Sequence, residues 1–82
     1  MKSIKPLGKN LLVEPLKDKN AFNVEVEKEY GKVLSKGDEV TGIEVGDTIA
    51  WKSFALKTIE VDDDKYHFIG SDSPFLLGII ND

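Results

Sequence analysis

The sequence predicts an all-β fold built from short strands. Apolar residues mostly alternate with polar ones or occur in short runs, and they do not recur at the helical spacing of three and four over a dozen residues. Clusters of glycine, aspartate and proline separate these runs at short intervals, which is typical of a β-barrel or β-sandwich. With 82 residues the chain has room for one domain, which we expect to span residues 1–82.

The first half of the chain contains three expected strands. Residues 11–13 are apolar and lie between Gly8 and Pro15, which we take as the limits of the first strand. Residues 22–26 alternate between apolar and polar side chains and form the second, with one apolar face. Residues 30–35 form the third, followed by a turn over 36–39 in which glycine and aspartate favour a reversal of the chain.

Three further strands are expected in the second half, over residues 48–54, 57–61 and 65–69. The last two are joined by a tight polar turn of three aspartates, Asp62 to Asp64. Trp51 is expected to fill the core, although a large aromatic residue in a strand can also anchor an interface.

The last strand is expected at residues 76–80, where the apolar run is nearly continuous, although residues 72–74 could instead begin a helical turn. An exposed edge of this kind promotes aggregation unless another strand pairs with it. The N-terminal segment is also extended, because Pro6 disfavours helix at the preceding residue. We therefore predict that these two segments of neighbouring subunits meet, through Ser3, Ile4, Lys5 and Pro6 on one side and Leu76, Leu77, Ile79 and Ile80 on the other.

The composition argues against several classes of partner. The formal net charge is −4 with mixed signs along the chain, so no basic face is expected for nucleic acid or anionic lipid. We find neither an apolar leader nor a stretch long enough to span a bilayer, so a cytoplasmic location is expected. The sequence has no cysteine for a disulfide, which leaves oligomerisation as the expected means of stabilising so small a core.

Catalytic and metal-binding residues are not expected. His67 is the only histidine and lies in an alternating strand, where it should face solvent or a subunit contact. The three aspartates at 62–64 lack the spacing of a calcium loop, because consecutive residues point in different directions. No phosphate-binding glycine loop or nucleophile motif is present in the sequence, so we expect no enzymatic activity, no metal and no cofactor.

Four short strings together resemble the GroES-like co-chaperonin family. They are Pro6-Leu7-Gly8 followed by Leu11-Leu12-Val13, then Gly31-Lys32-Val33-Leu34, then Val45-Gly46-Asp47 before an apolar strand, and last Gly70-Ser71-Asp72 before the final apolar run. None of the four is specific alone, whereas their order, spacing and polarity together are. The resemblance covers most of the chain and implies a small irregular β-barrel.

The resemblance also implies a function. Members of the family form rings of seven subunits, in which the first strand of one subunit pairs with the last strand of the next. The ring caps the chamber of a large, GroEL-like chaperonin, which itself binds the ATP. A mobile loop docks on that chaperonin through a short hydrophobic tripeptide. In this sequence the loop corresponds to residues 17–29, and the expected docking residues are Asn20, Ala21, Phe22, Asn23, Val24, Glu25 and Val26. The alternative is that Phe22, Val24 and Val26 form the core face of a strand.

Two features differ from the usual family pattern. The loop is short and lacks the glycine pair before the tripeptide, and only residues 38–45 remain where most members insert a hairpin that roofs the ring. A roofless ring resembles phage-encoded co-chaperonins, which would work in the host cytoplasm. The alternative function is an oligomeric structural or interaction barrel, for example a phage-associated one, that has lost chaperonin docking. A relative of the barrel in medium-chain dehydrogenases ranks last, because the chain lacks their zinc ligands and has no room for a nucleotide domain.

Overall fold

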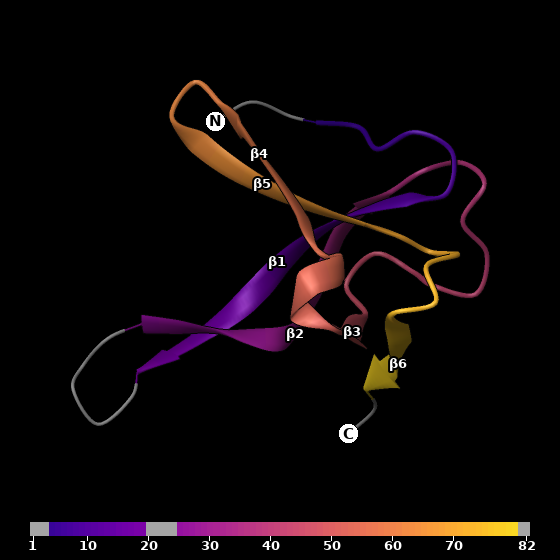
Figure 1. Ribbon diagram of the computed structural model, residues 1–82. Coiled ribbons are helices and arrows are strands. Elements are labelled where there is room, and N and C mark those ends of the chain that lie inside the picture. Colours follow the sequence, from indigo (N-terminus) through magenta and orange to yellow (C-terminus); the bar gives the residue numbers. More distant parts are fainter. Residues whose placement is uncertain (1–3, 20–24, 81–82) are drawn as a thin grey trace.

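Among residues 4–19 and 25–80, six antiparallel strands form one sheet in the order β4-β5-β1-β2-β3-β6 (Figure 1). The structure is a computed structural model that describes residues 4–19 and 25–80. The elements are β1 (Asn10–Lys19), β2 (Glu25–Lys36), β3 (Thr48–Trp51), the short 3₁₀ helix η1 (Ser53–Ala55), β4 (Lys57–Val61), β5 (Asp64–Gly70) and β6 (Leu76–Ile80). The all-β prediction is confirmed, and the sheet is consistent with the small barrel of the GroES-like fold.

The core explains why the sheet curls. It consists of apolar side chains from β1, β2, β3 and β5 and from the connection between β2 and β3, namely Leu11, Val13, Val33, Val40, Ile43, Ile49, Trp51 and Ile69. Strands β3 and β5 are not neighbours in the sheet, yet both contribute to this one cluster. The sheet must therefore bend around it. The prediction that Trp51 fills the core is confirmed, since only 1% of its surface is exposed.

Strand β1 does not end at Pro15, so that predicted limit is wrong. The strand continues to Lys19, and the register with β2 shifts between Pro15 and Lys17. Strand β5 pairs with β1 only from Asn10 to Val13. At Pro15 the strand has therefore become an edge on that side, where a residue without an N–H group is tolerated.

Strand β2 replaces two of the predicted strands. Residues 30–35 are not a separate element, because β2 runs without a break from Glu25 to Lys36. The pairing with β1 shifts in register within this strand, because Pro15 stands opposite Gly31 whereas Lys17 stands opposite Glu27. Extra residues on one strand are the mark of a bulge, which bends the strand and increases its twist.

Strand β3 ends earlier than the predicted limit of residue 54. The chain turns through η1 after Trp51, and Phe54 lies in this turn with 70% of its surface exposed. Its ring packs edge-to-face against Phe75, with the ring centroids 4.7 Å apart. The sequence expectation placed this end too late because it extended the strand to the apolar residue Phe54, although the alternation of Ile49 and Trp51 stops at the polar residue Ser53.

The turn between β4 and β5 and the strand after the next turn both lie where the sequence predicts them. Asp62 and Asp63 both have positive φ, 51° and 69°, and close the hairpin between β4 and β5 as a two-residue turn. The chain then reaches β6 through a non-helical turn, so the strand at residues 76–80 is confirmed and the helical alternative is wrong.

Candidate functional site

The far ends of β1 and β2 form a two-stranded ribbon that projects from the rest of the sheet (Figure 1). Pairing of β1 with β5 stops at Val13, and pairing of β2 with β3 extends only over Tyr30–Lys32. Beyond these points residues 17–19 pair with residues 25–27 and with no third strand of the described chain. The last paired positions of this ribbon, Lys19 and Glu25, directly flank residues 20–24.

The expected docking loop is shorter than its predicted bounds of 17–29. Backbone pairing continues to Lys19 opposite Glu25, and Asp18 stands opposite Val26. Of the predicted docking residues, Glu25 and Val26 thus belong to strand β2, and the part of the loop between the paired positions is only residues 20–24. Asn20, Ala21, Phe22, Asn23 and Val24 lie outside the described residues, so their docking role and the alternative core role both stay predictions.

Strand β6 offers an apolar edge at one end of the sheet. One side of it pairs with β3, and no strand of residues 4–19 or 25–80 pairs with the other. Leu76 packs partly against the core, whereas Leu77, Ile79 and Ile80 are 60%, 39% and 44% exposed. These are the residues that the sequence assigned to the subunit contact. The structure brings them together on a single open edge.

The N-terminal segment lies at the other end of the sheet, beside β4 and β5. It is not part of the sheet, and within it Pro6 is buried, Ile4 is half-buried and Lys5 is exposed. Ser3 is outside the described residues. Together with the hairpin of β4 and β5 the segment borders an open groove, whose apolar lining comes from Ile4, Pro6, Leu7, Ile59 and Phe68. The two segments predicted to pair between subunits thus lie at opposite ends of the strand order within one subunit.

The connection between β2 and β3 contains no strand, so no roof hairpin is present between residues 37 and 47. It lies against the body of the protein instead, because Val40 and Ile43 are buried in the core. These two anchors were not predicted from the sequence. The available signal was the presence of β-branched apolar residues in a stretch rich in glycine and charge, although this signal alone does not separate Val40 and Ile43 from the exposed Val45.

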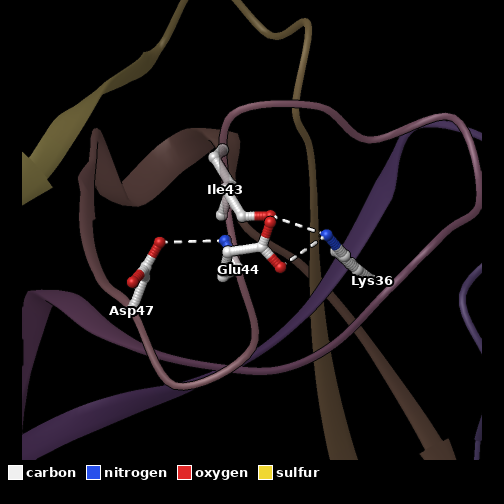
Figure 2. A network of polar contacts seen from close by, with 4 residues as sticks. All are labelled: Lys36, Ile43, Glu44 and Asp47. Carbon is white, nitrogen blue, oxygen red and sulfur yellow. Dashed lines mark hydrogen bonds and ion pairs between the residues drawn. The ribbon is translucent and has the colours of Figure 1, made fainter.

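A polar network fixes the same connection to β2. The ammonium group of Lys36 donates to the carbonyl oxygen of Ile43 at 3.1 Å and to the carboxylate of Glu44 at 2.9 Å (Figure 2). The backbone N–H of Glu44 in turn donates to the carboxylate of Asp47 at 2.9 Å. The backbone N–H groups of Val33 and Gly46 donate to the carbonyls of Asp47 and Val33, both at 2.9 Å. This arrangement gives the Val45-Gly46-Asp47 string a structural role in the return to β3.

The described residues hold no cluster of three or more side chains that could bind a metal ion. His67 pairs through Nδ1 with the hydroxyl of Thr58 at 2.9 Å, across the hairpin of β4 and β5. Within residues 4–19 and 25–80, no helix has the length and apolar character needed to cross a bilayer.

Comparison with known proteins gives matches over nearly the whole chain. No family model matches the sequence. Two curated relatives do, each named co-chaperonin GroES: one from Fusobacterium nucleatum subsp. polymorphum, 30% identical over 90 residues, and one from Fusobacterium nucleatum subsp. nucleatum, 28% identical over 90 residues. Each match covers 95% of this chain and 98% of the relative. Because 90 exceeds the 82 residues of the chain, each alignment contains gaps in this sequence.

Proposed function

Because the chain belongs to the GroES co-chaperonin family, we propose that it acts as a co-chaperonin, assembling into a ring that caps the chamber of a large chaperonin and assists ATP-dependent protein folding. The observation that carries the proposal is the match to a co-chaperonin GroES at 30% identity over 95% of the chain. The ring has seven subunits in this proposal. It catalyses no reaction and binds no cofactor, since the GroEL-like partner binds and hydrolyses the ATP.

The two apolar regions at opposite ends of the sheet support assembly into a ring. Leu77, Ile79 and Ile80 on the free edge of β6 would meet the N-terminal segment of the next subunit, near Ile4 and Pro6. A contact between two different surfaces is heterologous, and copies joined in this way form a closed ring when the rotation between neighbours is suitable. A ring also covers an apolar strand edge that would otherwise promote aggregation.

The projecting ribbon supports docking on a partner. Its last paired positions, Lys19 and Glu25, directly flank residues 20–24, and in this proposal Phe22 and Val24 are the apolar side chains that enter a groove on the chaperonin. Each subunit would contribute one weak contact, and the contacts around a ring would combine by avidity. Weak individual contacts also allow release, which a lid requires in each cycle.

The short connection between β2 and β3 supports a ring with a wide central opening. Residues 37–47 contain no hairpin that extends away from the subunit, and Val40 and Ile43 hold them against the core. In this proposal the protein is phage-encoded, works in the host cytoplasm and accommodates a bulky client.

The second candidate function is a structural barrel that assembles into a ring but no longer docks on a chaperonin. The short, glycine-poor segment at residues 20–24 favours this candidate, because Asn23 is polar at the centre of the expected tripeptide. Ring formation is common to both functions. The two functions differ in whether the ring binds a chaperonin.

Native mass spectrometry of the purified chain, alone and with a GroEL-like chaperonin, tests the proposal. We expect a heptamer alone, and a complex with the chaperonin that forms only with nucleotide and changes its ATPase rate. A heptamer that neither binds the chaperonin nor alters its ATPase rate supports the structural candidate. A monomer in all conditions contradicts both.

A further inference from the structure

The turn that precedes β1 is tied to two other parts of the chain. The carbonyl oxygens of three consecutive residues, Gly8, Lys9 and Asn10, each accept a hydrogen bond from a backbone N–H that is distant in sequence. The donors, in the same order, are Glu39 at 2.9 Å, Ser71 at 2.7 Å and Gly37 at 2.9 Å. Two of these donors belong to the connection between β2 and β3, and the third belongs to the turn between β5 and β6. Residues 8–10 are therefore a fixed point of the fold.

Asn10 makes two further hydrogen bonds within this turn, both to the same atom. Its backbone N–H donates to the carbonyl oxygen of Leu7 at 3.1 Å, and its side-chain Nδ2 donates to that oxygen at 2.9 Å. A carbonyl oxygen has two lone pairs, so Asn10 occupies both acceptor sites. The short asparagine side chain is well suited to bond the backbone of a turn in this way. The peptide plane between Leu7 and Gly8 is thereby fixed in orientation.

The N-terminal segment joins the turn at this peptide plane. Residues 4–6 belong to no strand, and among the described residues they take part in no backbone hydrogen bond. They lie beside β4 and β5 and form one wall of the open groove, which Leu7 and Asn10 also line (Figure 1). The position of the segment therefore depends on the packing of Ile4 and Pro6 and on the direction in which the chain leaves Leu7.

The backbone between Leu7 and Ile4 is stiff. The ring of Pro6 restricts its own φ to about −65°, and Lys5, as the residue before a proline, is restricted to extended conformations. A stiff segment of three residues spans up to about 10 Å, so a small rotation of the peptide plane at Leu7 is amplified at Ile4. The orientation of the Leu7 carbonyl thus sets the place of Ile4 in the wall of the groove.

We propose that Asn10 is a positioning residue for subunit assembly, whose side-chain amide holds the Leu7 carbonyl and so keeps residues 4–6 in the place where the next subunit binds. The inference rests on the proposed function for the contact between subunits, in which the edge of β6 meets this segment. The arrangement of Asn10, Leu7 and residues 4–6 is itself a property of the lone subunit.

Positioning matters because a surface that is already ordered loses less conformational entropy when its partner binds. Without the amide of Asn10, the Leu7 carbonyl would exchange this donor for water, and residues 4–6 would sample several directions. Every subunit of a closed ring carries one such segment, so the cost of ordering it would recur at each contact.

Two variants remove the amide donor. Asn10→Ala truncates the side chain, and Asn10→Asp keeps its shape but offers only acceptor oxygens. Lys9→Ala is the control, because Lys9 is the neighbouring exposed residue of the same turn. For each chain, native mass spectrometry of a dilution series gives the concentration at which half of the rings have dissociated.

We expect the rings of both Asn10 variants to dissociate at a concentration about 2- to 10-fold higher than the parent, the effect of losing one neutral hydrogen bond, and Lys9→Ala to behave like the parent. The NMR order parameter of the Ile4 methyl group should fall in both variants, because the segment moves more freely. The amides of Glu39 and Ser71 should keep their protection against hydrogen exchange, since backbone carbonyls accept their bonds.

A double-mutant cycle separates positioning from general support of the fold. If Asn10 acts through the segment, Asn10→Ala combined with Ile4→Ala raises the dissociation concentration by less than the product of the two single effects. A combined effect equal to the product overturns the proposal, and so does an Asn10→Ala ring that dissociates at the same concentration as Lys9→Ala. Loss of protection at Glu39 and Ser71 also overturns it, because Asn10 would then hold the turn together and not direct the segment.

A parent chain that forms no ring at any concentration overturns the proposed function instead. The order parameter of the Ile4 methyl group in the lone subunit then decides on the positioning. If it falls in Asn10→Ala but not in Lys9→Ala, the role of Asn10 in placing the segment is upheld, and equal values in the two variants overturn it.

Discussion

Gly31 lies so close to Glu14 of the neighbouring strand that any side chain at position 31 would collide with the backbone. A Cβ atom built on Gly31 would overlap the carbonyl oxygen of Glu14 and would also press on the Cα atom of Pro15. This contact is at the register shift between β1 and β2, at the base of the projecting ribbon. The glycine of the Gly31-Lys32-Val33-Leu34 string is therefore required by the close approach of two backbones.

Replacement of Gly31 by alanine should destabilise the protein by about 2–3 kcal/mol, because backbone atoms cannot move aside as a flexible side chain can. Urea unfolding at one fixed protein concentration measures the change, since a ring couples stability to concentration. Lys32→Ala is the matched control, because Lys32 is the next residue and is exposed. A Gly31→Ala protein as stable as the Lys32→Ala control would contradict the steric argument.

Lys36→Met should loosen the connection between β2 and β3 and reduce stability by about 1 kcal/mol, because the carbonyl of Ile43 loses a charged donor. Glu44→Gln should cost less than about 0.5 kcal/mol, because Glu44 is 74% exposed and surface ion pairs contribute little. Hydrogen exchange at Gly46 reports on the connection, since its N–H donates to Val33. Equal effects of the two variants would show that the ion pair, and not the bond to Ile43, holds the connection.

Asp63→Gly should stabilise the hairpin of β4 and β5 by about 0.5 kcal/mol, because Asp63 has φ of 69° and glycine adopts that conformation at no steric cost. Asp63→Ala should destabilise it, since alanine has neither that freedom nor a side chain that bonds locally. The denaturation midpoint of each variant measures the difference. If both variants shift stability in the same direction, loss of the Asp63 carboxylate rather than the backbone conformation determines the effect.

Much of this fold follows from local pattern. The apolar run at residues 11–13 and the alternation after Lys57 and Lys65 located β1, β4 and β5. Strands β1 and β5 contribute side chains to the core, whereas β4 is largely exposed and was located by its alternation and by the aspartate turn that follows it. The predicted ends of the strands were wrong where tertiary contacts override local preference. Strand β1 passes Pro15 because it has lost its partner on one side, and β3 ends before Phe54 because the chain turns there to reach β4.

The candidate site could be predicted only in part from the sequence. The apolar residues of β6 identified an edge, since an apolar run near the end of a chain needs a partner. The alternation at 22–26 could not show that β1 and β2 remain paired up to Lys19 and Glu25, because register depends on where a bulge falls. The anchoring of the β2 to β3 connection by Lys36 joins residues seven and eight positions apart across an irregular segment, so no strand or helix periodicity signals it.

Leu77→Asp should prevent ring assembly without unfolding the subunit. Leu77 is 60% exposed on the free edge of β6, so a carboxylate there stays hydrated in a lone subunit but would lose its water in an apolar contact. Native mass spectrometry should show monomers with unchanged circular dichroism. Leu34→Asp is the matched control, because Leu34 is 46% exposed but lies on β2, away from both ends of the sheet. Loss of the ring in both variants would mean that added charge, and not the β6 edge, is responsible.

Phe22→Asp should abolish binding to the chaperonin and leave the ring intact, if residues 20–24 dock as proposed. The expected cause is that an aspartate cannot enter an apolar groove without losing its hydration, and that the loss is repeated at every subunit of the ring. Co-sedimentation with the chaperonin and nucleotide measures binding, and native mass spectrometry of the same sample confirms the ring. The control is Asn20→Asp, which adds the same negative charge at the start of the segment and removes no apolar group. The competing interpretation, in which Phe22 belongs to the core face of a strand, predicts a different result for the same variant: the subunit itself would lose about 3–5 kcal/mol and unfold before docking could be measured.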